Sequence, residues 1–99
     1  MAYVLMITDR AGVDDLRARH KDAHYAYLET NRGKLLFRGG MKDEATGAFI
    51  GGLLILDVET REEAEGFLAA DPFAQAGMLA EFRIERLAPA YCAPSDRWR

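Results

Sequence analysis

LLILDVETREEAEGFLAADPF, residues 53–73, places an apolar strand signal directly before two successive helix starts. The apolar run belongs to a longer stretch, residues 49–58, which predicts a strand. Thr60 and Glu63 then match a capping box, in which the hydroxyl and the carboxylate satisfy backbone N–H groups at a helix start. We expect this helix to reach Ala70.

A second helix start follows at Asp71-Pro72. Aspartate is a favoured N-terminal cap and proline fits the first helical position, so a short turn is predicted here, with Gly77 placed to end it. After the turn, Ala80, Phe82 and Ile84 alternate with charged residues, which is typical of a strand with one solvated face. The chain from residue 49 onward therefore predicts a strand, a helix, a short turn and a strand.

The first half of the chain predicts a similar order. Residues 3–7 form an apolar run without helical spacing, which predicts a buried strand. From Val13 onward, apolar residues recur at helical spacing, and Gly33 is placed to serve as the C-terminal cap of this helix. Residues 34–37 predict a strand that stops at Gly39-Gly40, and residues 41–47 predict a loop.

The order βαββαβ predicts an α+β fold of the ferredoxin-like type, an antiparallel four-stranded sheet with helices on one face. Residues 4–7 and 53–56 are apolar at both strand parities, which indicates that the other face is buried as well. A second copy of the chain could cover that face by packing sheet against sheet. We therefore expect a homodimer, and a monomer with an exposed apolar patch is the alternative.

Composition limits the classes of function. The 99 residues, of which 49% are hydrophobic and 29% charged, predict one folded domain with a core at residues 1–88 and an irregular tail at 89–99. A net charge of -3 without a basic cluster argues against a nucleic-acid partner. The apolar runs predict neither a membrane span nor a signal peptide, and the single Cys92 fits a reducing compartment, so we expect a cytoplasmic protein.

Two histidines are candidates for chemistry. His20 and His24 share one face of the expected helix because they lie four residues apart. Zinc binding is one interpretation, but the glutamate that acts as the base in HExxH zinc enzymes is missing between them. We therefore predict neither a metal nor another cofactor. In the second interpretation, one histidine moves a proton while a carboxylate fixes its orientation.

Asp71 is the candidate for that carboxylate. Its position at a helix start would hold it in place through backbone N–H groups. Structural roles would also explain both residues, because an aspartate before proline is a common cap and a histidine on an amphipathic helix is commonly a surface or core residue. The residues alone leave both interpretations open.

Two segments of the chain are distinctive: the helix histidine with its apolar stripe, at residues 23–28, and the segment DPF-x-x-x-G, at residues 71–77. In order and spacing, these and several shorter segments resemble the YCII-related family. The resemblance implies a ferredoxin-like fold, a dimer of the α+β barrel kind and an active-site pair formed by His24 and Asp71. Further matching segments are Gly33-Lys34-Leu35, Arg38-Gly39-Gly40, Gly51-Gly52-Leu53-Leu54-Ile55 and Glu62-Glu63-Ala64.

Two positions depart from the family pattern. Many members carry Arg-Pro-x-His where this chain has Lys21-Asp22-Ala23-His24, so the arginine that could bind an anion is absent there. Arg17 or Arg19, earlier on the helix, could replace it, unless both side chains are simply solvated. Many members also have Gly-Pro where this chain has Gly39-Gly40, which removes rigidity from the end of the strand.

Residues near the pair complete the expected site. Gly39 and Gly40 do not fit the frames of nucleotide-binding loops, so we expect them to shape a turn or to let the backbone approach the pocket. With Arg38, and with Met41 and Phe73, which flank the pair, they form the expected substrate-binding set. Other aromatic residues are expected in the core rather than in the wall of a ligand site: Tyr25, Tyr27, Phe37 and Phe49.

Two hypotheses on function follow. In the first, the chain is a small-molecule enzyme in which His24 acts as general acid or base and Asp71 orients the imidazole and stabilises its protonated form. Because the pair lacks a nucleophile, a metal and a redox centre, lyase- or isomerase-type proton transfer is expected, with ring compounds among the substrates. In the second, the chain is a non-catalytic dimeric ligand-binding or protein-interaction module. Monooxygenation is a weaker third hypothesis.

Overall fold

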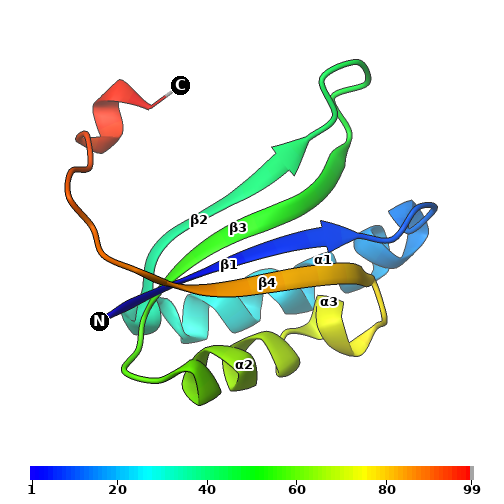
Figure 1. Ribbon diagram of the computed structural model, residues 1–99. Helices are drawn as coiled ribbons and strands as arrows, with labels where there is room; N and C mark the ends of the chain where they lie inside the picture. The colour runs from blue at the N-terminus through cyan, green and yellow to red at the C-terminus, as the bar shows by residue number, and fades with distance from the viewer. Residues whose placement is uncertain (99) are drawn as a thin grey trace.

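A computed structural model describes residues 1–98 and shows a four-stranded antiparallel sheet with the helices on one face (Figure 1). The strand order is β2-β3-β1-β4. This arrangement confirms the predicted ferredoxin-like α+β fold. The elements are β1 (Ala2–Asp9), α1 (Asp14–Thr30), η1 (Arg32–Lys34), β2 (Leu35–Lys42), β3 (Phe49–Asp57), α2 (Arg61–Ala69), α3 (Pro72–Gln75), β4 (Leu79–Leu87) and η2 (Ser95–Arg97).

The core lies between the helices and the facing side of the sheet. Tyr3, Leu5 and Ile7 of β1 share this side because alternate strand residues point the same way, and all three are buried. Leu5 and Leu56, in neighbouring strands, have no exposed surface at all. Burial of each such leucine side chain stabilises the fold by roughly 1.5–3 kcal/mol. A second buried cluster, formed by Val13, Phe73 and Met78, lies beside α3.

The second half of the chain folds as its capping signals predict. Thr60 caps α2 as predicted, by accepting a hydrogen bond from the backbone N–H of Glu63 at 3.2 Å. The other half of the capping box is wrong, because the Glu63 carboxylate accepts from the threonine hydroxyl, at 3.5 Å, instead of from a backbone N–H. Asp71 caps α3 by accepting from the backbone N–H of Phe73. Gly77 ends the turn with a φ of 77°, in the left-handed region that favours glycine.

The long helix α1 ends earlier than predicted, and Gly33 is not its cap. The first residue beyond the helix is Asn31, whose side-chain amide and backbone N–H both donate to the carbonyl of Tyr27. Because this amide satisfies a carbonyl of the last turn, the helix ends without a glycine. Gly33 lies in the short η1 that follows.

The strand β2 continues through the two glycines at which the prediction ended it. Gly39 pairs with Leu53 of β3, and Gly40 pairs with Gly52, so the ladder extends to Lys42. The neighbouring strand thus satisfies the backbone groups that a loop would expose to water. The glycines consequently lie inside the sheet.

The helices α1, α2 and α3 leave the other face of the sheet uncovered (Figure 1). Val4, Met6, Leu53 and Ile55 lie on this outer face and are only partly buried. Beyond β4 the tail leads back towards β2, where the Trp98 ring contacts Phe37, with 5.2 Å between ring centroids. None of the helices in residues 1–98 has the length and apolar character that a membrane span requires.

Candidate active site

His24 of α1 and Asp71 at the start of α3 meet on the helix side of the sheet. The Oδ1 atom of Asp71 accepts from the backbone N–H of Phe73 at 3.0 Å and lies 2.8 Å from Nδ1 of His24. Asp71 is only 3% exposed, so the cap holds a buried carboxylate in one place. Because Nδ1 of the imidazole is engaged by Asp71, Nε2 is the ring nitrogen that remains for another partner.

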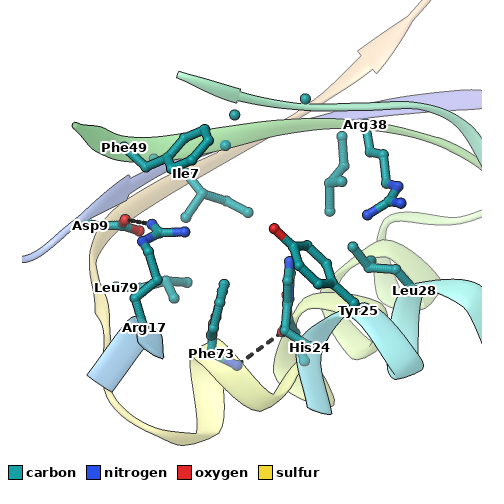
Figure 2. A pocket seen from close by; sticks show the side chains of 16 residues that line it. Ile7, Asp9, Arg17, His24, Tyr25, Leu28, Arg38, Phe49, Phe73 and Leu79 are labelled. Atoms are coloured by element: carbon teal, nitrogen blue, oxygen red, sulfur yellow. Dashed lines mark hydrogen bonds and ion pairs between the residues drawn. The ribbon is translucent and has the colours of Figure 1, made fainter. Parts of the chain in front are cut away.

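An aromatic contact fixes the rotation of the same imidazole. The His24 ring stacks on Phe73 with 3.9 Å between centroids and 12° between planes, and Tyr25 lies against its other side at 5.5 Å. The His24 side chain is 15% exposed. The ring is therefore held by a hydrogen bond and by stacking, and its free edge points into the space between Arg17 and Tyr25 (Figure 2).

A cavity of about 350 Å³ lies over this free edge. It lies between α1 and α3 on one side and the sheet on the other, it is open to solvent beside Tyr25 and Phe49, and residues from six elements line it. Small-molecule sites have volumes of roughly 300–1,000 Å³, so this cavity suits a small ligand.

Four of the five predicted substrate-binding residues line the cavity: Arg38, Gly39, Gly40 and Phe73. Met41 is not among the lining residues. It follows Gly40 on β2, and consecutive strand residues point to opposite faces of a sheet. Because the helix side of Gly40 faces the cavity, the Met41 side chain is directed away from it, and the expected contact of Met41 with a substrate does not fit this register.

A second charged pair lies at the other end of the cavity. Arg17 precedes His24 by two turns of α1, and its guanidinium donates to the carboxylate of Asp9 at the end of β1. The Asp9 side chain is 8% exposed, whereas that of Arg17 is 23% exposed. The guanidinium also lies over the rings of Phe73 and Phe49, at 5.1 and 5.5 Å from their centroids.

Sequence reasoning left Arg17 and Arg19 as equal alternatives, and it did not associate Asp9 with the site. The structure brings Arg17 to the cavity, whereas Arg19 is exposed. The spacing of seven residues between Arg17 and His24, two helical turns, is the signal that distinguishes the two arginines. Asp9 shares strand parity with Ile7, which predicts that both face the helices.

Tyr25 and Phe49 were expected in the core, and this expectation is wrong. They are 48% and 45% exposed, and both line the cavity. Phe49 begins β3 next to the hairpin, where the Arg17 guanidinium of α1 lies over its ring but does not bury it. Aromatic residues are often buried, which led to the prediction. Both rings are instead exposed because they border the open cavity, Tyr25 from α1 and Phe49 from the start of β3.

Residues 1–98 contain no cluster suited to a metal ion. No group of three or more His, Cys, Asp and Glu side chains in this part of the chain comes close enough to share an ion. His20, four residues before His24, does not line the cavity.

Tyr27 joins the two long helices behind the pair. Its hydroxyl donates to the carbonyl of Phe67 in α2 at 2.8 Å. Burial, and after it the negative charge of Asp71, raises the pKa of Tyr27 above its ordinary value of 10.0. The proton on Tyr27 therefore helps to hold α1 against α2 close to the buried carboxylate.

Comparisons with known proteins identify the family. A family model described as the YCII-related domain matches residues 1–88. The chain belongs to this family. Protein YciI of Escherichia coli O6:H1 and Protein YciI of Shigella flexneri are each 32% identical to it over 92 residues, which cover 86% of this chain and 94% of either relative.

Solved structures agree with this assignment. The YCII-related chain matches 5-chloro-2-hydroxyhydroquinone dehydrochlorinase from Burkholderia phenoliruptrix, in its complex with 2,5-dihydroxybenzoquinone, with a TM-score of 0.85 and 31% identity, covering 91% of this chain and 96% of that one. Protein Atu4242 from Agrobacterium tumefaciens matches with a TM-score of 0.55 and 13% identity, covering 95% and 98%. The second match concerns the fold alone.

Proposed function

We propose that this chain is a small-molecule enzyme in which His24 transfers a proton and Asp71 orients the imidazole. The observation that carries the proposal is the series of contacts from the Phe73 N–H through Asp71 to His24, at 3.0 and 2.8 Å, which ends at a cavity of about 350 Å³. In the tautomer whose Nδ1–H donates a hydrogen bond to Asp71, Nε2 carries the lone pair and can accept a proton from a ligand. The Asp71 charge stabilises the imidazolium that forms.

The reaction class follows from the groups that reach the cavity. General acid–base transfer next to fixed charges supports isomerase- or lyase-type chemistry. In an isomerisation the histidine takes a proton from one atom of the substrate and returns it to another, whereas in an elimination it takes the proton, the electron pair of the broken bond forms a double bond, and a leaving group such as chloride departs. The similar dehydrochlorinase was solved with a quinone, which supports a small ring compound as the substrate of this chain. The polar lining residues are Asp9, Arg17, His24, Tyr25, Arg38 and Asp71.

A non-catalytic ligand-binding module is the second candidate. It is favoured by the cap of α3, because this structural role explains an aspartate at position 71 without any catalytic role. The two candidates differ in whether His24 changes its protonation state when a ligand is bound. Turnover, rather than binding, therefore separates them.

Turnover of 5-chloro-2-hydroxyhydroquinone and related hydroxylated rings, followed by the loss of substrate, is the test. His24→Gln should lower turnover by roughly 10²- to 10⁴-fold, the usual contribution of a general acid or base. Asp71→Ser should also lower turnover while keeping the cap of α3, because serine is a good capping residue. Asp71→Ala should lower turnover and also remove the cap of α3, which should lower the free energy of unfolding by about 1 kcal/mol. Equal turnover in wild type and His24→Gln would contradict the catalytic proposal, and binding without turnover in wild type would favour the module.

We further propose that the protein acts as a cytoplasmic homodimer. Support for the dimer comes from the outer face of the sheet, where Val4, Met6, Leu53 and Ile55 are only partly buried in a single chain. Support for the compartment comes from the exposed thiol of Cys92, which suits a reducing environment.

A further inference from the structure

We infer that the cavity takes a planar ring compound that carries an anionic oxygen, and that Arg17 binds this oxygen opposite His24. The inference deepens the proposed function and rests on it, because it assigns a class of ligand to the same site. Three features carry it: the fixed guanidinium of Arg17, the balance of charge around the cavity, and the flat surface at Gly52.

The guanidinium of Arg17 is held in place before any ligand arrives. Asp9 holds it from the β1 side, and the rings of Phe49 and Phe73 lie on either side of it. A guanidinium has five N–H donors, and Asp9 is its only hydrogen-bond partner within residues 1–98. Figure 2 shows the second terminal nitrogen pointing into the cavity, towards Tyr25 and His24. Such a fixed donor suits an anionic oxygen.

Once His24 has taken up a proton, the charges around the cavity favour an anion over a cation. Asp9 and Asp71 are each engaged, the first by Arg17 and the second by His24. Arg38 also lines the cavity, next to the Tyr25 ring at 5.7 Å, and forms no ion pair within the described part of the chain. The lining is neutral with neutral His24 and gains one positive charge when His24 takes up a proton. An anion therefore gains attraction at the step in which His24 acts as a base.

The sheet side of the cavity is flat where the ligand would lie. Gly40 and Gly52 are paired across β2 and β3, so neither places a side chain over the sheet. A Cβ atom at Gly40 would meet the Phe49 ring at 2.6 Å, whereas a Cβ atom at Gly52 would have no neighbour nearer than 3.5 Å. The space over Gly52 is therefore open, and the Phe49 ring borders it. Bare backbone beside an aromatic ring suits the face of a flat ring.

Three probes of similar size separate the elements of this inference. Benzoate is planar and anionic, benzamide is planar and neutral, and cyclohexanecarboxylate is anionic but puckered. Binding is measured by calorimetric titration and by the amide shifts of residues around the cavity. Wild type should bind benzoate more tightly than either of the other two probes.

Arg17→Gln should weaken benzoate binding by roughly 10- to 100-fold, as expected for the loss of a hydrogen bond to a charged group, and should leave benzamide binding unchanged. Because this variant leaves the Asp9 carboxylate without its partner, the double variant Asp9→Asn with Arg17→Gln is the control for folding, and it should show the same loss. Gly52→Ala should keep the fold and weaken both planar probes, since its methyl group occupies the space of the ring.

The inference is overturned if benzoate does not bind wild type, if it binds no better than benzamide, or if both Arg17 variants retain its affinity. These outcomes are independent of the turnover test. A loss of benzoate binding in the Arg17 variants together with normal turnover in His24→Gln would support the anion site and reject the proton-transfer proposal. Normal benzoate binding in the Arg17 variants, together with lost turnover in His24→Gln, would reject the anion site and support the proton-transfer proposal.

Discussion

At the scale of single residues, one oxygen atom of Asp71 both caps a helix and contacts the candidate catalytic histidine. Its Oδ1 accepts from the backbone of Phe73 and contacts Nδ1 of His24. The first contact is local and forms whenever α3 forms, whereas the second joins residues 47 positions apart. A carboxylate already ordered by the cap loses little further conformational freedom when it orients the imidazole. The position of the His24 ring, the proposed proton-transfer group, is therefore maintained by the same carboxylate that caps the start of α3.

Tyr27 provides a prediction at this scale. Because its pKa is raised in the folded protein, its contribution to stability is complete below the ordinary value of 10.0 and is lost as the pH rises through the folded pKa. Tyr27→Phe should lower the free energy of unfolding at neutral pH by about 1 kcal/mol, since the Phe67 carbonyl loses its donor. Above pH 10.0 the difference between the two proteins should shrink. Urea unfolding at both pH values measures it.

The matched control is Tyr25→Phe, because Tyr25 is 48% exposed and its hydroxyl has no hydrogen-bond partner within residues 1–98. This variant should follow the stability of wild type at both pH values. A constant difference between wild type and Tyr27→Phe from neutral to alkaline pH would show that the Tyr27 proton does not contribute to the packing of α1 on α2.

At the scale of elements, local signals predict the second half of the chain better than the first. The cap at Thr60 and the turn from Asp71 to Gly77 depend on side chains within a few residues of one another, so the sequence contains the whole interaction. The end of α1 at Asn31 and the extension of β2 through Gly40 depend on a side-chain amide and on pairing with β3. Glycine alone does not show which of these occurs.

The candidate site divides in the same way. The helix histidine and the capping aspartate are visible as family segments, and the fold brings them together. The partnership of Arg17 with Asp9 requires the angular position of one residue on α1 and the parity of the other on β1. Neither is visible in composition or in a short motif. The cavity itself arises from missing side chains at paired glycines, which only the register of β2 against β3 reveals.

Two neighbouring glycines of β3 give a prediction for this element. A Cβ atom at Gly51 would collide with the Ile7 carbonyl oxygen of β1, whereas one at Gly52 has room. Gly51→Ala should therefore destabilise the fold by roughly 1–3 kcal/mol, the usual cost of overpacking. Gly52→Ala should be neutral or stabilising, because glycine within a strand costs roughly 0.5–1 kcal/mol relative to alanine. Thermal and urea unfolding compare the two variants, and equal stabilities would show that β1 and β3 separate without cost.

At the scale of the whole molecule, the two faces of the sheet have separate uses. The helix side contains the core and the cavity. None of the helices α1, α2 and α3 covers the outer face, and the tail contacts it at Phe37 (Figure 1). Because the strands have apolar residues on both faces, covering the outer face with a second copy would bury further apolar surface without blocking the cavity.

The proposed dimer gives the prediction at this scale. Met6 lies opposite Leu53 on the outer face, so Met6→Lys places a charge in the middle of the expected interface, where it would have to lose its water. Wild type should sediment at twice the mass of the chain, and Met6→Lys should sediment as a monomer. Ala26→Lys adds the same charge on the exposed side of α1 and should remain dimeric. A monomeric wild type would contradict the dimer, whereas a monomeric Met6→Lys that still binds benzoate would show that one chain forms the whole site.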